Sequence, residues 1–240
     1  MLKKLKPPKE QDDMAAMDRS APTIRITIID TETTGISRQD QVIEVGLIQL
    51  EVSSITGQIL QRLNQYSGLR EPSCPMHPAA EQTHGISMKQ LRGQRLNEDL
   101  IVEMIQQSER LIAHNAGFDR SMLKRTLPHA ARGPWLCSVR GIRWRQKGFA
   151  SARLDYLLEV HGIQRPRSHR AFDDAEALGK LLAHDDPATG RPYLCELLES
   201  RPLSGGSQTK AKTPMSESPL LIELKKRLDA ASSTPEPPIH

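Results

Sequence analysis

The middle of the chain alternates strand-like and helix-like segments, and this order constrains the fold more than any other feature of the sequence. Five apolar, largely β-branched runs are typical of strands and cover residues 24–29, 41–50, 57–66, 110–113 and 135–139. Apolar residues recur at helical spacing in four other segments, residues 97–108, 118–127, 154–160 and 171–183. The first three strands follow one another without a helix, which indicates a meander. The pattern therefore predicts an α/β domain in which helices flank a mixed five-stranded sheet.

The two ends of the 240-residue chain differ in composition from this middle part. Residues 1–22 have almost no apolar periodicity, so we expect a mobile N-terminal tail there and a domain over residues 23–200. Residues 201–240 contain six Pro and six Ser, which is typical of a linker. Within it, the spacing of four leucines predicts a short amphipathic helix over 219–230. We expect this helix either to fray or to dock, on the core or on a polymerase or other protein partner.

No part of the sequence has the features of a membrane or secreted protein. The apolar runs fall well short of the roughly 18–20 residues that a membrane helix needs, and the basic residues at the start are not followed by an apolar segment. Cys74, Cys137 and Cys195 are far apart and form no C-x-x-C pair, which argues against a disulfide framework and a zinc cluster. These observations favour a cytoplasmic protein without a membrane partner.

Two acidic residues follow the first strand run. Asp30 and Glu32 lie two positions apart on extended chain, so their side chains point to the same face. Two close carboxylates repel each other unless cations neutralise them, and carboxylate oxygens are ligands that Mg²⁺ or Mn²⁺ prefers. The alternative is a polar strand end that enters a turn formed by Thr33, Thr34 and Gly35.

Two later segments place further acids and a histidine near helix starts. Asp119 ends the sequence His-Asn-Ala-Gly-Phe-Asp after the fourth strand run, at the same sheet edge as Asp30 if the two strands are neighbours. His169 precedes Asp174 by five residues, so both side chains reach one point outside the start of the last helix. A neutral imidazole at that point can accept a proton from water. Each residue also has a purely structural alternative. Asp119 and Asp174 are then ordinary acidic residues at helix N-termini, and His169 is an exposed loop histidine.

The order and spacing of these motifs resemble those of a known enzyme family. D-x-E, then H-N-x-x-F-D, then H-R-A-x-D-D-A is similar to the three motifs of the DEDDh (DnaQ-like) 3′→5′ exonucleases, a family that includes the proofreading epsilon subunit of bacterial DNA polymerase III. The segments Ile-Glu-Val-Gly at 43–46 and Thr-His-Gly-Ile-Ser at 83–87 add to the resemblance, which covers residues 24–183. It implies an RNase H-like fold and metal-dependent hydrolysis of phosphodiester bonds from a free 3′ end, with release of nucleoside 5′-monophosphates.

The resemblance also implies a role for each motif residue. The four acids would hold two divalent ions, Mg²⁺ or Mn²⁺, and are Asp30, Glu32, Asp119 and Asp174. His169 would be the general base, and Glu44 is expected to orient a neighbour rather than bind metal. The positions that surround the terminal nucleotide are Thr33, Thr34, Gly35, His84, Asn115 and Phe118. For Phe118 the alternative is core packing.

A basic segment suggests how a nucleic acid is bound. Residues 131–170 contain nine Arg or Lys against two acids, in a chain of net charge +4. The same segment carries four aromatic residues, Trp135, Trp144, Phe149 and Tyr156. Cations interleaved with rings suit a single strand, because the cations contact phosphates and the rings stack on bases. The alternative is a solvated charged surface over aromatic residues of the core.

The sequence therefore favours an exonuclease that acts on single-stranded 3′ ends of DNA, in proofreading or repair. An exoribonuclease of the same family is the first alternative, because chemistry at phosphate does not separate the two substrates. A non-catalytic nucleic-acid-binding polymerase accessory module is the second. It is disfavoured because a binding protein has no need for four acids and a histidine in this order.

Overall fold

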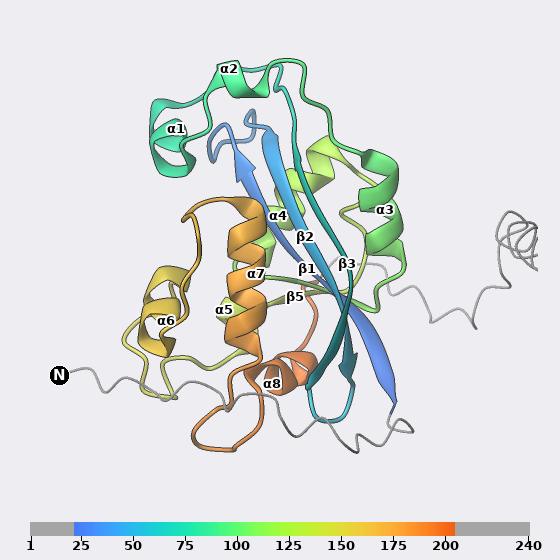
Figure 1. The fold of residues 1–240 in the computed structure, drawn as a ribbon, viewed down its shortest axis with the longest axis vertical. Helices are drawn as coiled ribbons and strands as arrows, with labels where there is room; N and C mark the ends of the chain where they lie inside the picture. Colours follow the sequence, from blue (N-terminus) through green and yellow to red (C-terminus); the bar gives the residue numbers. More distant parts are fainter. Residues whose placement is uncertain (1–21, 205–240) are drawn as a thin grey trace, which may run out of the picture. The chain divides into compact units, whose positions relative to one another are not determined.

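The computed structural model describes residues 22–204, and most of both expected tails, with the helix predicted at 219–230, lies outside these residues. One five-stranded sheet has the order β3-β2-β1-β4-β5 (Figure 1). The strands are β1 (Thr23–Thr33), β2 (Val42–Ser53), β3 (Ile59–Leu69), β4 (Arg110–Ala113) and β5 (Trp135–Cys137). The first three strands are antiparallel neighbours, whereas β4 runs parallel to both β1 and β5. The predicted mixed sheet is confirmed.

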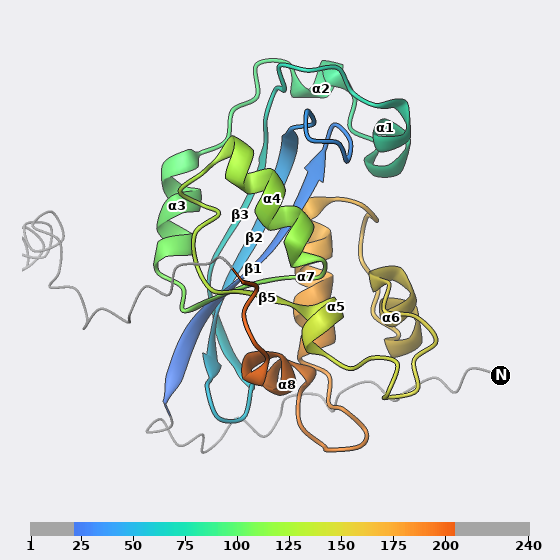
Figure 2. The ribbon, with the colours of Figure 1, turned by 180° about the vertical axis from the view of Figure 1, so that it is seen from behind.

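Helices cover both faces of this sheet (Figures 1 and 2). On one face lies α7 (Ala171–Leu182), with α6 (Leu154–His161) and α8 (Tyr193–Glu199) beside it, and on the other lie α3 (Glu98–Gln106) and α4 (Ala116–Thr126). Successive residues of β1 alternate between the two layers: Ile28 is buried in the core cluster that contains α7, and Ile29 in the one that contains α3 and α4. The middle of the central strand is therefore shielded from water on both sides.

A glycine on β2 sets the position of α7. A Cβ atom at Gly46 would lie 2.3 Å from backbone atoms of Ala171 and Phe172, so no side chain fits between β2 and the first turn of α7. This close approach brings the start of α7 next to the end of β1, which pairs with β2 around Gly46. The position of the third motif, which contains His169 and Asp174, therefore depends on Gly46.

The element boundaries differ from the expectation in two ways. Strand β1 continues through Thr33, so Asp30 and Glu32 belong to the strand and do not follow it. Four short helices were not anticipated, α8 and also α1 (Pro78–His84), α2 (Met88–Leu91) and α5 (Ser138–Gly141). They have four to seven residues, too few for a helical repeat of apolar residues to be recognisable. No helix within residues 22–204 is long and apolar enough to cross a membrane.

Three of the four aromatic residues of the basic segment are buried in the core and the fourth, Tyr156, is half-buried against it, which corrects the expectation that they stack on bases. Trp135 and Trp144 are 0% and 1% exposed, and Phe149 is also buried. The ring of Trp144 lies 5.7 Å from that of Phe149 and 4.9 Å from that of Tyr193, and its Nε1 donates to the carbonyl oxygen of Ser138. These rings gain more from burial than from exposure, and burial removes their faces from any nucleic acid.

Candidate active site

The carboxyl ends of β1 and β4 bring the first two motifs together. The two strands are parallel neighbours, with Ile28 opposite Ile112, and α4 begins three residues after β4 ends. Asp119, in the first turn of α4, is 4% exposed and accepts a hydrogen bond from the Thr31 hydroxyl at 2.9 Å. Thr31, between the two acids of β1, therefore fixes the orientation of the third acid.

The start of α7 adds the third motif from the other face of the sheet. Asp174 lies in the first turn of α7, and His169 lies in the preceding loop with a φ of 56°, in the left-handed region. Histidine adopts this conformation more readily than most residues with a side chain. Glu32, His169 and Asp174 each offer one potential ligand atom, and these three atoms lie within 4.8 Å of one another.

All four predicted metal ligands and the predicted base line one pocket of about 190 Å³. Asn115 and Phe118 line it as well. The half-buried ring of Phe118 also packs against the core cluster under α4, so it takes part in both the core and the pocket. A group of oxygen donors this crowded has the chemistry that a hard divalent cation requires. The donor set therefore fits one or two such ions.

The remaining predicted residues lie outside this pocket. Thr33 and Thr34 are buried, and their hydroxyls donate to the Gly35 carbonyl oxygen and to the Asp40 carboxylate, which holds the turn after β1. His84, at the end of α1, is 5% exposed, and its Nδ1 accepts from the backbone N–H of Ile86. Its Nε2 is buried without a hydrogen-bond partner in the structure. A buried polar atom that lacks a hydrogen-bond partner destabilises the fold, so its presence in a structure needs an explanation.

Crowding changes the acid strength of the carboxylates. Burial, followed by the charges of Asp119 and Glu32, raises the pKa of Asp30 well above its ordinary value. Burial and then the charge of Asp174 raise the pKa of Glu32 to about 8, and burial raises that of Asp119 to about 7. Burial also raises the pKa of Asp174, against the opposing effect of Arg165. Without cations the folded protein therefore holds protons at this site near neutral pH.

These raised pKa values predict that, without divalent ions, the site lowers the stability of the fold by an amount that depends on pH. A carboxyl whose pKa is higher in the folded than in the unfolded chain stabilises the fold below about pH 4, and this contribution is lost as pH rises through the folded pKa. Buried histidines with lowered pKa values have the opposite effect, because they make the fold more stable as pH rises. The informative quantity is therefore the difference in the free energy of unfolding between wild type and a variant that lacks one carboxylate. We expect the stability of Glu32→Gln relative to wild type to increase steadily from pH 5 to pH 8. Urea unfolding in EDTA measures this difference, and a pH-independent difference would contradict the raised pKa of Glu32.

Two arginines neutralise three of the acids around the site. Arg165, with a 10% exposed side chain, contacts Asp174 at 2.5 Å and also Asp155. Arg170 binds Glu44, which is 1% exposed, through three hydrogen bonds, and Glu44 also accepts from the backbone N–H of Ala171. Glu44 therefore attaches β2 to the start of α7, in agreement with the expectation that it orients a neighbour. Arg165 was not anticipated, because only the fold brings it next to Asp174.

His114 is a second residue of the site whose role the sequence did not suggest. It lines the pocket, and its Nδ1 and Nε2 lie 2.8 Å from the Ser138 hydroxyl and 2.7 Å from the Ala152 carbonyl oxygen. The ring thus connects both ends of the 138–152 segment to the end of β4. Burial lowers the pKa of His114, which favours a neutral ring with one donor and one acceptor nitrogen. The sequence showed only that His114 opens the second motif.

Comparison with known proteins agrees with this geometry. The model of an exonuclease family, of the RNase T type, matches residues 27–182. Exodeoxyribonuclease 10 of Escherichia coli K12 is 32% identical over 162 residues, which are 65% of this chain and 66% of that enzyme. PolC-type DNA polymerase III of Thermotoga petrophila is 28% identical over 180 residues, which are 69% of this chain but 12% of the polymerase.

Solved structures give the same result for the fold. Exonuclease X in complex with 5′ overhanging duplex DNA is 29% identical, with a TM-score of 0.51 over 66% of this chain and 89% of that one. Exonuclease I of E. coli in complex with a dA16 oligonucleotide is 18% identical, with a TM-score of 0.54 over 72% of this chain and 42% of that one. These neighbours, together with the mixed sheet, agree with the RNase H-like fold.

Proposed function

This chain belongs to the exonuclease family whose model matches residues 27–182, and from this premise we propose that it removes nucleotides from a free 3′ end of DNA and depends on divalent metal ions. The observation that carries the proposal is the convergence of Asp30, Glu32, Asp119, Asp174 and His169 on one pocket. Two further facts support DNA as the substrate: the 32% identical relative is named an exodeoxyribonuclease, and the 29% identical solved structure contains DNA. The 3′→5′ direction rests on the order of the motifs.

The side chains divide the chemistry among them. The four carboxylates would hold two divalent ions, Mg²⁺ or Mn²⁺, which when bound stabilise charge on the attacking and leaving oxygens of an in-line displacement. His169 would accept the proton of the attacking water, since its ring lies beside Glu32 and Asp174. Thr31 keeps Asp119 directed at the site through its hydroxyl. Hydrolysis in this way leaves a nucleoside 5′-monophosphate.

The residues around the terminal nucleotide would have three different tasks. Asn115 and Phe118 line the pocket, where the ring of Phe118 can stack on a base. The turn formed by Thr33, Thr34 and Gly35 sets the end of β1, and its backbone borders the nucleotide. His84 lies outside the pocket with its ring buried, so its task would be to hold the loop after α1 through the bond that its Nδ1 accepts from the backbone N–H of Ile86.

A labelled-oligonucleotide assay tests the proposal. We expect a 3′-labelled single-stranded DNA to release labelled mononucleotide at once, and a 5′-labelled one to shorten one nucleotide at a time. Both reactions should need Mg²⁺ or Mn²⁺ and should stop in EDTA, and a matched RNA should be cut more slowly. Mononucleotide released first from the 5′ label would contradict the direction, full activity in EDTA would contradict the metal dependence, and faster cutting of RNA would make the protein an exoribonuclease.

A further inference from the structure

A second hollow within residues 22–204 lies apart from the catalytic pocket and has no part in the chemistry described above. It has a volume of about 810 Å³ and is bordered by the 137–147 segment, by α8 and by the loop before α8. Five cations border it, Arg140, Arg143, Lys147, Arg191 and Arg201, against the three carboxylates of Asp186, Glu196 and Glu199. The excess of positive charge suits an anionic ligand.

Ion pairs within the hollow divide these cations into two groups. Lys147 is largely buried and contacts Asp186 at 2.6 Å and Glu196 at 2.7 Å, so its charge is fully used inside the fold. Arg191 contacts Glu199 at 3.2 Å. The other three, Arg140, Arg143 and Arg201, are exposed and form no ion pair within the part of the chain that the structure describes. We name these three residues the arginine rim.

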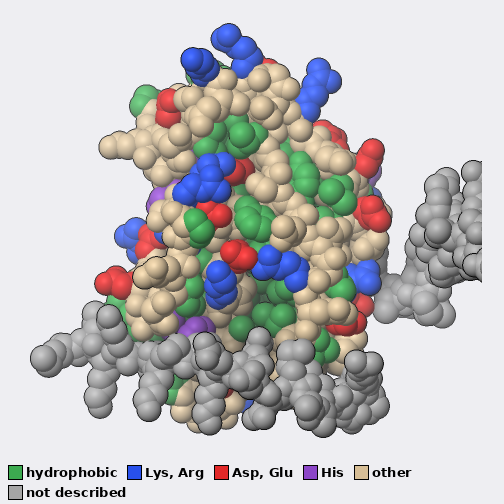
Figure 3. Space-filling model, in the orientation of Figure 1, with side chains coloured by type: hydrophobic (Ala, Val, Ile, Leu, Met, Phe, Trp, Pro, Cys, Tyr) green, Lys and Arg blue, Asp and Glu red, His purple; other side chains and the backbone are tan. Residues whose placement is uncertain are grey.

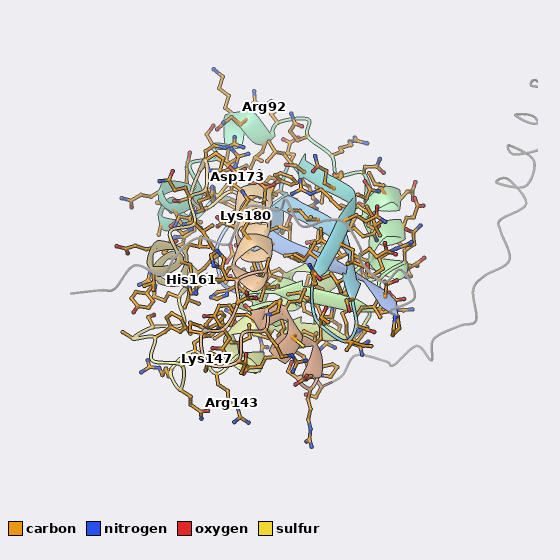
Figure 4. The ribbon with its side chains drawn as sticks, turned by 60° about the horizontal axis from the view of Figure 1, so that its bottom comes forward. Arg92, Arg143, Lys147, His161, Asp173 and Lys180 are labelled. Carbon is orange, nitrogen blue, oxygen red and sulfur yellow. The ribbon has the colours of Figure 1, made fainter. Side chains whose placement is uncertain are left out.

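The buried aromatic residues fix the backbone beside Arg143, one of the three residues of the arginine rim. Trp144 is anchored by its indole hydrogen bond and by Phe149, and turns in the backbone join Gln146 and Lys147 to Arg143. Because Trp144 points into the core, its neighbour Arg143 is left in solvent, and Figure 4 shows it at the same end of the molecule as Lys147. Binding at Arg143 therefore has to order the side chain but not the backbone.

The exposed cations over β3 and α7 are arranged differently. Over the middle of the face drawn in Figure 3, acidic and basic side chains are interleaved, in keeping with the Arg62–Glu176 pair between β3 and α7 and the Lys180–Glu176 pair within α7. Such pairs cancel each other's field and offer little to a phosphate. The arginine rim instead combines unpaired guanidinium groups with a hollow, which is the arrangement that binds phosphate through forked hydrogen bonds.

The segment that carries most of this rim is also connected to the catalytic pocket. His114, which lines that pocket, contacts Ser138 before and Ala152 after the basic turn, and Leu154 and Asp155 line the pocket directly afterwards. The chain therefore passes from the large hollow to the catalytic pocket within about twenty residues, from Cys137 to Asp155.

We propose that the arginine rim is a second nucleic-acid site, which binds the phosphates of the substrate strand upstream of the 3′ end that is being hydrolysed. This inference rests on the proposed exonuclease function, because it assigns the rim to the same strand. A short oligonucleotide would occupy the catalytic pocket alone, and a long one would occupy both sites. The rim would then affect the affinity for long strands and leave hydrolysis of short ones unchanged.

The experiment compares two triple variants of the full chain. Arg140→Gln/Arg143→Gln/Arg201→Gln removes the rim, and Lys89→Gln/Arg92→Gln/Arg95→Gln is the control. The control removes three exposed cations on and after α2, at the opposite end of the molecule, which also form no ion pair within residues 22–204. Fluorescence anisotropy in EDTA measures binding of labelled single-stranded DNA of 4 and 20 nucleotides without hydrolysis. Turnover of the 4-nucleotide substrate with Mg²⁺ is measured separately.

We expect the rim variant to bind the 20-nucleotide strand about tenfold more weakly and with a salt slope smaller by about 2, at roughly 0.7 per lost phosphate contact. Its binding and turnover of the 4-nucleotide strand should equal those of wild type. An equal loss in both triple variants would reduce the effect to net charge and overturn the proposal, as would unchanged binding. Slower turnover of the short strand would place these arginines at the catalytic pocket, which also overturns it. None of these outcomes depends on the direction of hydrolysis, so the two proposals fail separately.

Discussion

Asp30→Asn is expected to reduce hydrolysis by at least about 10³-fold while the fold is retained. Asp30 lies among the other three acids, so its loss removes a ligand that no neighbouring side chain replaces. Catalytic groups that act as a unit lose most of their effect when one member is removed. Single-turnover hydrolysis of 5′-labelled DNA measures the rate. Isothermal titration with Mn²⁺ should show weaker metal binding in the same variant.

Thermal unfolding in EDTA separates this loss from misfolding. Removing the Asp30 carboxylate relieves repulsion by Asp119 and Glu32, so the midpoint should stay the same or rise slightly. Asp174→Asn is the matched comparison. It should lower the midpoint, because it deprives the largely buried Arg165 of one of its two carboxylates. An Asp30→Asn protein that hydrolyses DNA at the rate of wild type would exclude this carboxylate from the metal site.

The motifs could be predicted from the sequence because their geometry is local. Asp30 and Glu32 share a face of one strand, and Asp174 follows His169 at one helix start, so spacing along the chain already defines each pair. The parallel pairing of β1 and β4 then completes the pocket, and from the sequence this pairing was only a condition for bringing Asp119 next to Asp30. The mixed sheet followed from the same patterns.

Other parts of the site depend on contacts between segments that are distant in sequence. Arg165 contacts Asp174 and Asp155, and His114 contacts Ser138 and Ala152, only after the sheet and α7 have assembled. Composition was misleading in the 131–170 segment, because counts of cations and rings do not show which side chains are buried. Lys147 forms an ion pair with Asp186 inside the fold, and Trp144 is part of the core. Burial is decided by packing, which a charge count does not contain.

His169→Asn is expected to slow hydrolysis by roughly 10²–10⁴-fold, the usual contribution of a general base. Asparagine is chosen because the residue has a φ of 56°, which asparagine tolerates and alanine does not. The substitution therefore removes the proton acceptor without straining the loop before α7. Single-turnover hydrolysis of 5′-labelled DNA with saturating Mg²⁺ measures this rate for both proteins.

The position of the ring beside Glu32 and Asp174 allows it two roles, and metal affinity separates them. A general base affects the rate and leaves metal binding unchanged, whereas a ligand affects both. We expect His169→Asn to bind Mn²⁺ within about twofold of wild type in isothermal titration, against the much larger loss in Asp30→Asn. A tenfold or greater loss of affinity would make His169 a metal ligand, and near-normal turnover would mean that another group deprotonates the water.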